Sequence, residues 1–158
     1  HTMSDPAITP AVCCRDPRAA VAWLGTAFGF TPTVVIESPD GDPARSHYEV
    51  SPGGAAALAV SGIWAEWTRS PHDSGGNTQW LTVRLPEEVG AAGLDAHCER
   101  ARSAGAEIAD EPADEFFGDR RYRAVDPEGH HWTFAVHVRD VGQAEAEEFL
   151  GHRIERWS

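Results

Sequence analysis

Three polar side chains alternate along one short stretch of the sequence, and their types suit acid–base or metal chemistry. Arg45, His47 and Glu49 occupy every second position of the segment ARSHYEV. Successive side chains of a strand point to opposite faces of its sheet, so these three are expected to share one face. A histidine titrates close to neutral pH, and a carboxylate on the same face could share a proton or a metal ion with it.

A second stretch with chemical potential runs from residue 116 to residue 136 and reads FFGDRRYRAVDPEGHHWTFAV. Its centre, DPEG, is typical of a β-turn, because Pro fixes φ near −65° and Gly accepts a positive φ. The stretch therefore predicts a β-hairpin. On its second arm the period of two places His131 and Thr133 on one face, with Trp132 and Phe134 on the core-facing side.

The first arm of this hairpin carries Arg120 and Tyr122. Aligning Ser51-Pro52 with the Asp126-Pro127 turn makes His47 and Tyr122 equivalent, so both are expected to face one cavity. A histidine opposite a phenol could move a proton.

The elements that must position these side chains form a repeat. Asp16 and Pro17 are a strong helix start, and Gly29 and Gly105 are natural helix stops that lie 76 residues apart. The equal spacing of corresponding turns argues for internal duplication of a strand, a helix and three strands. The expected strands are 8–14, 33–37, 45–50 and 55–60, then 79–85, 107–110, 120–125 and 131–138, with helices starting after Asp16 and spanning about 91–104.

These elements divide the chain into five expected parts. Residues 1–7 are a leader that begins with a tag remnant, His1-Thr2-Met3. The first module spans 8–62, a connecting loop 63–77 and the second module 78–138. Residues 139–158 form a C-terminal segment with an amphipathic helix over about 141–157.

The composition of the chain disfavours some classes of binding partner. Lys plus Arg number 13 against 25 Asp plus Glu, a formal charge of −12, which disfavours nucleic acid and anionic membranes. No apolar run of about 18 residues is present, so a soluble, cytoplasmic protein is expected. Its three cysteines, Cys13, Cys14 and Cys98, predict free thiols rather than a disulfide framework.

Three motifs give the chain a family resemblance: AxxWLxxAFGF in the first helix, AGAEI after the second, and GDRxYxxxDPEGHxWxF in the last hairpin. With the paired modules, they resemble the vicinal-oxygen-chelate superfamily, which includes glyoxalase I, extradiol dioxygenases and bleomycin-resistance proteins. The similarity covers about residues 8–138. It implies an α+β fold in which two βαβββ modules curl mixed sheets around a concave cavity.

Enzymes of that superfamily hold a divalent metal with one residue near the first strand and one on the fourth strand of each module. Aligned with that pattern, the four positions of this chain are Thr9, Ala57, Trp80 and Thr133. This set cannot supply the required charge and N or O ligands, so no metal cofactor is expected. The alternative is a divalent metal at a displaced site built from His47, Glu49 and His131.

Six tryptophans then become the main functional signal. Aromatic walls in an acidic protein suit a bulky cationic aromatic molecule, and bleomycin-resistance proteins bind a cationic glycopeptide without turning it over. A metal-independent protein that sequesters such a drug or secondary metabolite, as a homodimer, is the leading hypothesis. Its expected binding residues are Trp80, His47, Glu49, Arg120, Tyr122, His131, Thr133, Trp64 and Trp67.

The alternative is an enzyme, with no catalytic residue assigned firmly. It would be a glyoxalase-like lyase or isomerase, or a dioxygenase. It would use the displaced metal site or acid–base chemistry at His47, His131 and Tyr122.

Overall fold

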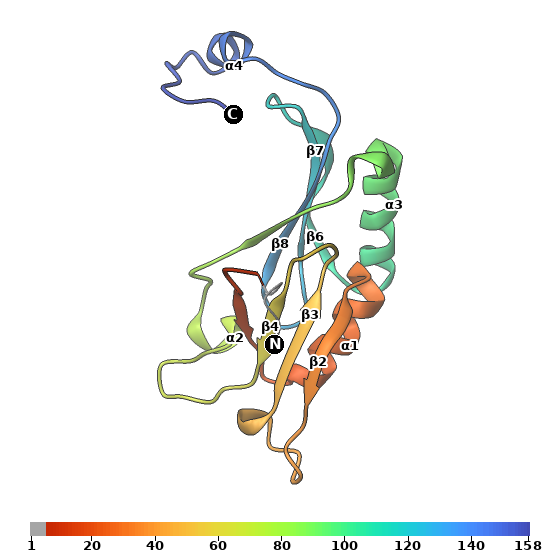
Figure 1. Cartoon of the computed structure of the whole chain (residues 1–158), viewed down its shortest axis with the longest axis vertical. Coiled ribbons are helices and arrows are strands. Elements are labelled where there is room, and N and C mark those ends of the chain that lie inside the picture. The colour runs from red at the N-terminus through yellow and green to blue at the C-terminus, as the bar shows by residue number, and fades with distance from the viewer. Residues whose placement is uncertain (1–5) are drawn as a thin grey trace.

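The computed structural model describes residues 6–158, so the expected tag remnant His1-Thr2-Met3 lies outside the described residues. It contains two βαβββ modules in sequence (Figure 1). The first consists of β1 (Ala11–Cys13), α1 (Pro17–Phe28), β2 (Thr31–Ile36), β3 (His47–Ser51) and β4 (Leu58–Ser61). The second consists of β5 (Leu81–Arg84), α3 (Gly90–Ser103), β6 (Glu107–Asp114), β7 (Asp119–Val125) and β8 (His131–His137).

Each module forms one four-stranded mixed sheet, with the strand orders β1-β4-β3-β2 and β5-β8-β7-β6. The first strand of each module pairs parallel with its fourth strand, and the other pairs are antiparallel. The predicted α+β class and the duplicated order of elements are therefore confirmed.

The helix signals of the sequence act as predicted at α1. The Asp16 side chain accepts a hydrogen bond from the backbone N–H of Ala19 at 3.1 Å, and Pro17 occupies the first turn. Gly29 ends the helix with φ of 74°, a conformation that costs a residue with Cβ more than it costs glycine. The cap at Asp16 and the glycine at Gly29 set the two ends of α1, and the second of them sets where β2 begins.

One side of both sheets carries the core. α1 and α3 lie side by side along that side of the molecule (Figure 1). Aromatic side chains fill the space between helices and sheets, and Phe28 of α1 contacts the rings of Trp132 and Phe134 of β8. The two modules therefore share one hydrophobic core.

Several element boundaries differ from the prediction. Arg45 belongs to a short 3₁₀ turn, η1 (Pro43–Arg45), rather than to β3, and a one-turn helix, α2 (Pro71–Ser74), interrupts the connecting loop. A second 3₁₀ turn, η2 (Glu87–Val89), precedes α3. The C-terminal helix α4 covers only Gln143–Leu150, because Gly151 ends it in the left-handed conformation.

Among residues 6–158, no helix is long and apolar enough to cross a membrane.

Candidate functional site

The side of each sheet opposite α1 and α3, here called the open face, presents half of the strand side chains. In the first sheet it carries His47 and Glu49, because the alternate residues Tyr48 and Val50 are buried toward the helix. The Nε2 atom of His47 lies 2.9 Å from a carboxylate oxygen of Glu49. The side chain of Glu49 is 10% exposed and that of His47 is 45% exposed, so this pair offers the imidazole to solvent.

The open face of the second sheet carries Trp80, His131 and Thr133. Thr82 of β5 pairs with Thr133 of β8, and Trp80 stands one residue before β5, two positions from Thr82 on the same face. Trp80 is 72% exposed, whereas Thr133 is buried. The structure therefore brings these three together on one sheet, and His47 with Glu49 on the other.

Arginines are also present on this second open face. Arg84 donates to Asp119 at 2.7 Å, Arg121 donates to Glu115 at 3.2 Å, and Arg123 donates to Asp110. Each guanidinium thus has a carboxylate partner on the second sheet or its β6–β7 turn. Positive and negative side chains are therefore both present on this face.

Arg120 and Tyr122 do not lie where the sequence placed them. Tyr122 is fully buried beneath α3, where its hydroxyl donates to Nδ1 of His97 at 2.5 Å. Arg120 also points to α3 and pairs with Asp95 at 2.8 Å. The expectation that Tyr122 and His47 face one cavity is wrong, because the two side chains lie on opposite faces of their sheets.

The DPEGHxW block, the most specific part of the family resemblance, joins the two modules. The carboxylate of Glu128 accepts hydrogen bonds from the backbone N–H groups of Arg15 and Asp16, at 2.7 and 3.1 Å. Nε2 of His130 donates to the carbonyl of Cys13 at 2.8 Å. The polar side chains of Glu128 and His130 in the hairpin turn therefore hold the segment that leads into α1.

Inside the same turn, Asp126 organises the hairpin. Its carboxylate accepts hydrogen bonds from the indole N–H of Trp132 at 2.9 Å and from the backbone N–H groups of Glu128 and His130. Burial raises the pKa of Asp126, and these donors oppose that change.

A divalent metal does not fit the four positions that the resemblance assigns to the superfamily's ligands. Thr9, Ala57, Trp80 and Thr133 offer two hydroxyls, a methyl and an indole, with no carboxylate or imidazole among them. The displaced alternative is divided between the sheets, since His47 and Glu49 belong to the first and His131 to the second. Within residues 6–158, no group of three or more His, Cys, Asp or Glu side chains is arranged to hold a metal ion.

The connecting loop presents two further tryptophans. Trp64 and Trp67 contact each other edge to face, with ring centroids 5.0 Å apart, and are 54% and 76% exposed. Their loop is ordered by the buried hydroxyl of Thr68, which accepts from the backbone N–H groups of Trp64 and Ala65. The loop backbone that carries the two rings is therefore hydrogen-bonded, while the rings contact each other and face solvent.

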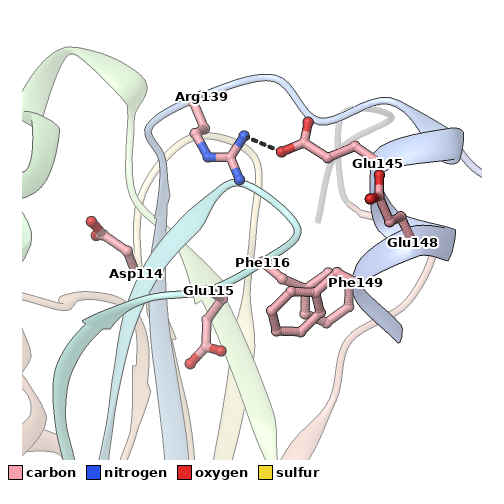
Figure 2. A pocket seen from close by; sticks show the side chains of 7 residues that line it. All are labelled: Asp114, Glu115, Phe116, Arg139, Glu145, Glu148 and Phe149. Atoms are coloured by element: carbon pink, nitrogen blue, oxygen red, sulfur yellow. Dashed lines mark hydrogen bonds and ion pairs between the residues drawn. The ribbon is translucent and has the colours of Figure 1, made fainter. Parts of the chain in front are cut away.

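A pocket of about 610 Å³, which the sequence did not single out, lies between the β6–β7 turn and α4. Figure 2 shows the side chains that line it. The rings of Phe116 and Phe149 stack inside it with centroids 4.8 Å apart. Arg139 pairs with Glu145 at its rim. It is lined by Asp114, Glu115, Phe116, Arg139, Glu145, Glu148 and Phe149. The pocket combines aromatic surface with an excess of carboxylates, and only the folded chain brings its two segments together.

Comparison with known proteins agrees with this architecture. The family model described as the glyoxalase/bleomycin resistance protein/dioxygenase superfamily matches residues 7–134. An uncharacterized protein of Mycobacterium bovis is 27% identical over 148 residues, which cover 90% of this chain and 91% of that protein.

Solved structures show the same fold. The crystal structure of TioX from Micromonospora sp. ML1 matches with a TM-score of 0.61 and 27% identity, covering 84% of this chain and 99% of TioX. A glyoxalase/bleomycin resistance protein/dioxygenase from Nocardioides matches with a TM-score of 0.60 and 23% identity, covering 90% and 91% of the two chains.

Proposed function

The chain belongs to the glyoxalase/bleomycin resistance protein/dioxygenase superfamily, and from that premise we propose that it binds a cationic aromatic small molecule without transforming it. The observation that carries this proposal is the exposure of Trp64, Trp67 and Trp80, which are each more than half exposed. Large aromatic side chains that are exposed at a surface are typical of binding sites, because a bound ligand removes their apolar surface from water.

Trp80 is the principal contact in this proposal. It stands at the edge of the second open face beside β8, where the neighbouring Thr82 and Thr133 are small enough to leave its ring accessible. A flat ligand could stack on the indole, and a positively charged ligand would gain further from a cation–π contact.

Glu49 and the overall charge of the chain would favour a cationic ligand. Glu49 lies on the first open face with only a tenth of its side chain exposed, where a charge is less screened than at the surface. The carboxylates of the pocket in Figure 2 contribute little, because three of the four, those of Asp114, Glu115 and Glu145, are paired with arginines. The overall charge of −12 would favour the approach of a cation.

Binding without chemistry is supported by the residues at the positions that the resemblance assigns to the superfamily's metal ligands. Thr9, Ala57, Trp80 and Thr133 cannot replace the imidazole and carboxylate ligands of the metal-dependent members. Sequestration of a drug or secondary metabolite requires binding affinity but no catalysis. Aromatic contacts would provide that affinity.

We infer that the functional unit is a homodimer. The two sheets of one chain do not close around a common interior, and apolar side chains outside the proposed binding set, including Val35 and Ile36 of β2, remain exposed. A second copy would cover part of this surface. Sedimentation should give a dimer at micromolar concentration, and a monomer would contradict the inference.

The second candidate function is acid–base catalysis, favoured by the 2.9 Å contact between His47 and Glu49. In that mechanism Glu49 orients the imidazole, and His47 moves a proton on a substrate bound over the first open face. Tyr122 takes no part, since it is buried beneath α3. Recovery of a chemically changed compound after incubation with the protein, and its loss in His47→Gln, would favour catalysis over sequestration.

The proposed function is tested with a panel of basic aromatic antibiotics, each paired with an analogue whose amines are acetylated. Titration followed by tryptophan fluorescence and calorimetry should give saturable binding of at least one cationic compound, with recovery of that compound unchanged. The acetylated analogue should bind more weakly. If no compound binds below about 100 µM, corresponding to about 5.5 kcal/mol, the proposal is wrong.

A further inference from the structure

A small cavity lies at the junction of the two modules, on the core side of the first sheet. Its volume is about 160 Å³. It is bounded by the end of β1, by one face of α1 and by the DPEG turn of the second module. Val12, Cys14 and Leu24 form its buried floor, Ala20 and Trp23 form a wall, and Pro127 stands at its exposed side.

The lining of this junction cavity offers few hydrogen-bonding groups to a water molecule. The polar groups on its rim, Asp126 and Glu128, direct their carboxylates to other partners: Asp126 accepts from the indole of Trp132, and Glu128 accepts from the backbone of Arg15 and Asp16. Water occupies a cavity when several polar groups there can form hydrogen bonds with it, whereas an apolar cavity stays dry. The site therefore suits a molecule that forms no hydrogen bonds.

The walls are held in place without a ligand. His72 donates to the carbonyl of Pro127 at 2.8 Å, and Asn77 donates to that of Gly129 at 3.0 Å, so the turn is fixed from outside. The indole N–H of Trp23 donates to the carbonyl of Ala104 at 2.8 Å, which fixes the opposite wall. A preformed cavity spares a ligand the cost of ordering the protein.

We propose that the junction cavity is a second binding site, which takes a small uncharged apolar molecule about the size of one aromatic ring. Apolar protein cavities of about 150 Å³ take up benzene or xenon. The junction cavity has a similar volume and an apolar floor, with the carboxylates of Asp126 and Glu128 at its rim. Carboxylates at the rim disfavour an anion. The Cys14 thiol is not a reactive group there, because burial raises its pKa well above the ordinary value and keeps it protonated.

This site is independent of the proposed function. Val12 of β1 lines the junction cavity, whereas its neighbour Cys13 points to the opposite side of the sheet, which is the open face. A ligand in the cavity would contact α1 and the turn of the second module together. Its occupancy is expected to stabilise their association and raise the melting temperature.

Benzene is the probe for this proposal, with benzoate as a charged analogue of the same ring. Benzene should bind saturably, with intermolecular nuclear Overhauser effects from its protons to the methyl groups of Val12 and Leu24, and should raise the melting temperature. Benzoate should do neither. Effects confined to Trp80 or the connecting loop would place benzene on the open face and overturn the proposal.

Two matched variants on the same helix locate the site. Ala20→Leu adds its side chain into the cavity and should weaken benzene binding about tenfold or more. Ala22→Leu adds the same atoms on the exposed side of α1 and should leave affinity within about twofold. Equal affinity in both variants would contradict the assignment. If Ala20→Leu fails to fold, the Overhauser effects in the unmodified protein still decide the question.

Discussion

The carboxylate of Glu128 accepts a hydrogen bond from the backbone N–H of Arg15 at 2.7 Å, which links residues 113 positions apart. A second bond from the N–H of Asp16 makes the contact bidentate. The turn of the last hairpin thereby satisfies backbone groups just before α1, as a side-chain cap would. The two modules are thus joined through the start of the first helix as well as through the shared core.

Removing this contact should destabilise the junction of the modules. Glu128→Ala is expected to lower the free energy of unfolding by about 1 kcal/mol, because two donors lose a charged acceptor at a solvent-accessible site. Glu88→Ala, which removes an exposed carboxylate from η2, is the matched control and should change stability by less than about 0.5 kcal/mol. Urea denaturation gives both values, and equal effects would count against a joining role.

Asp126 and Trp132 should behave as an energetically coupled pair. Asp126→Ala removes the acceptor of a buried indole N–H and of two backbone N–H groups, at a cost of about 3 kcal/mol. Trp132→Phe in that background removes the orphaned indole donor, so the double variant should lose less than the sum of the two single losses. Strict additivity in a double-mutant cycle would show that the contact contributes nothing.

Stability should fall on mild acidification because of His97. Burial lowers its pKa below the ordinary value of 6.5, and the ring donates through Nε2 to the carbonyl of Phe28 while Nδ1 accepts from Tyr122. A depressed folded-state pKa means that the unfolded chain binds the proton more tightly. The contribution is therefore complete above about pH 6.5 and is lost as pH falls through the folded-state pKa.

The variant His97→Gln isolates this effect. Its amide can donate to Phe28 and accept from Tyr122 but does not titrate, so stability should fall less between about pH 7 and about pH 5 than in the unmodified protein. His137 contributes with the opposite sign, because its hydrogen bond to Asp140 raises its pKa, and it is present in both proteins. If the free energy of unfolding depends on pH equally in His97→Gln and in the unmodified protein, the assignment of this effect to His97 is contradicted.

The duplicated fold could be predicted because its signals are local. Asp16, Pro17 and Gly29 fix α1 through capping and a positive φ, and alternation of apolar residues marks β8. The length of β1 could not be obtained in this way, because strand ends depend on the pairing partner. The end of α4 has a local signal of the same kind as Gly29, but the prediction followed the apolar pattern to residue 157 instead of stopping at Gly151.

The face of β7 was misassigned for a physical reason. Aligning Ser51 with Asp126 uses an offset of 75 residues, whereas Gly53 and Gly129 are 76 apart, and a slip of one residue moves a side chain to the opposite face. The pocket of Phe116 and Phe149 had no local signal at all. Its two sides come from a turn and a helix that meet only after α4 folds back toward β6 and β7 (Figure 2).

The central claim is that exposed tryptophans bind a cationic aromatic ligand, and one measurement tests it most directly. For a cationic compound that binds, its affinity for Trp80→Ala is compared by calorimetry with its affinity for Trp157→Phe, a change at a tryptophan outside the proposed set. Loss of stacking and cation–π contact at Trp80 should weaken binding about tenfold, equivalent to about 1.4 kcal/mol, while Trp157→Phe leaves it unchanged. An affinity for Trp80→Ala equal to that of the unmodified protein would contradict the account.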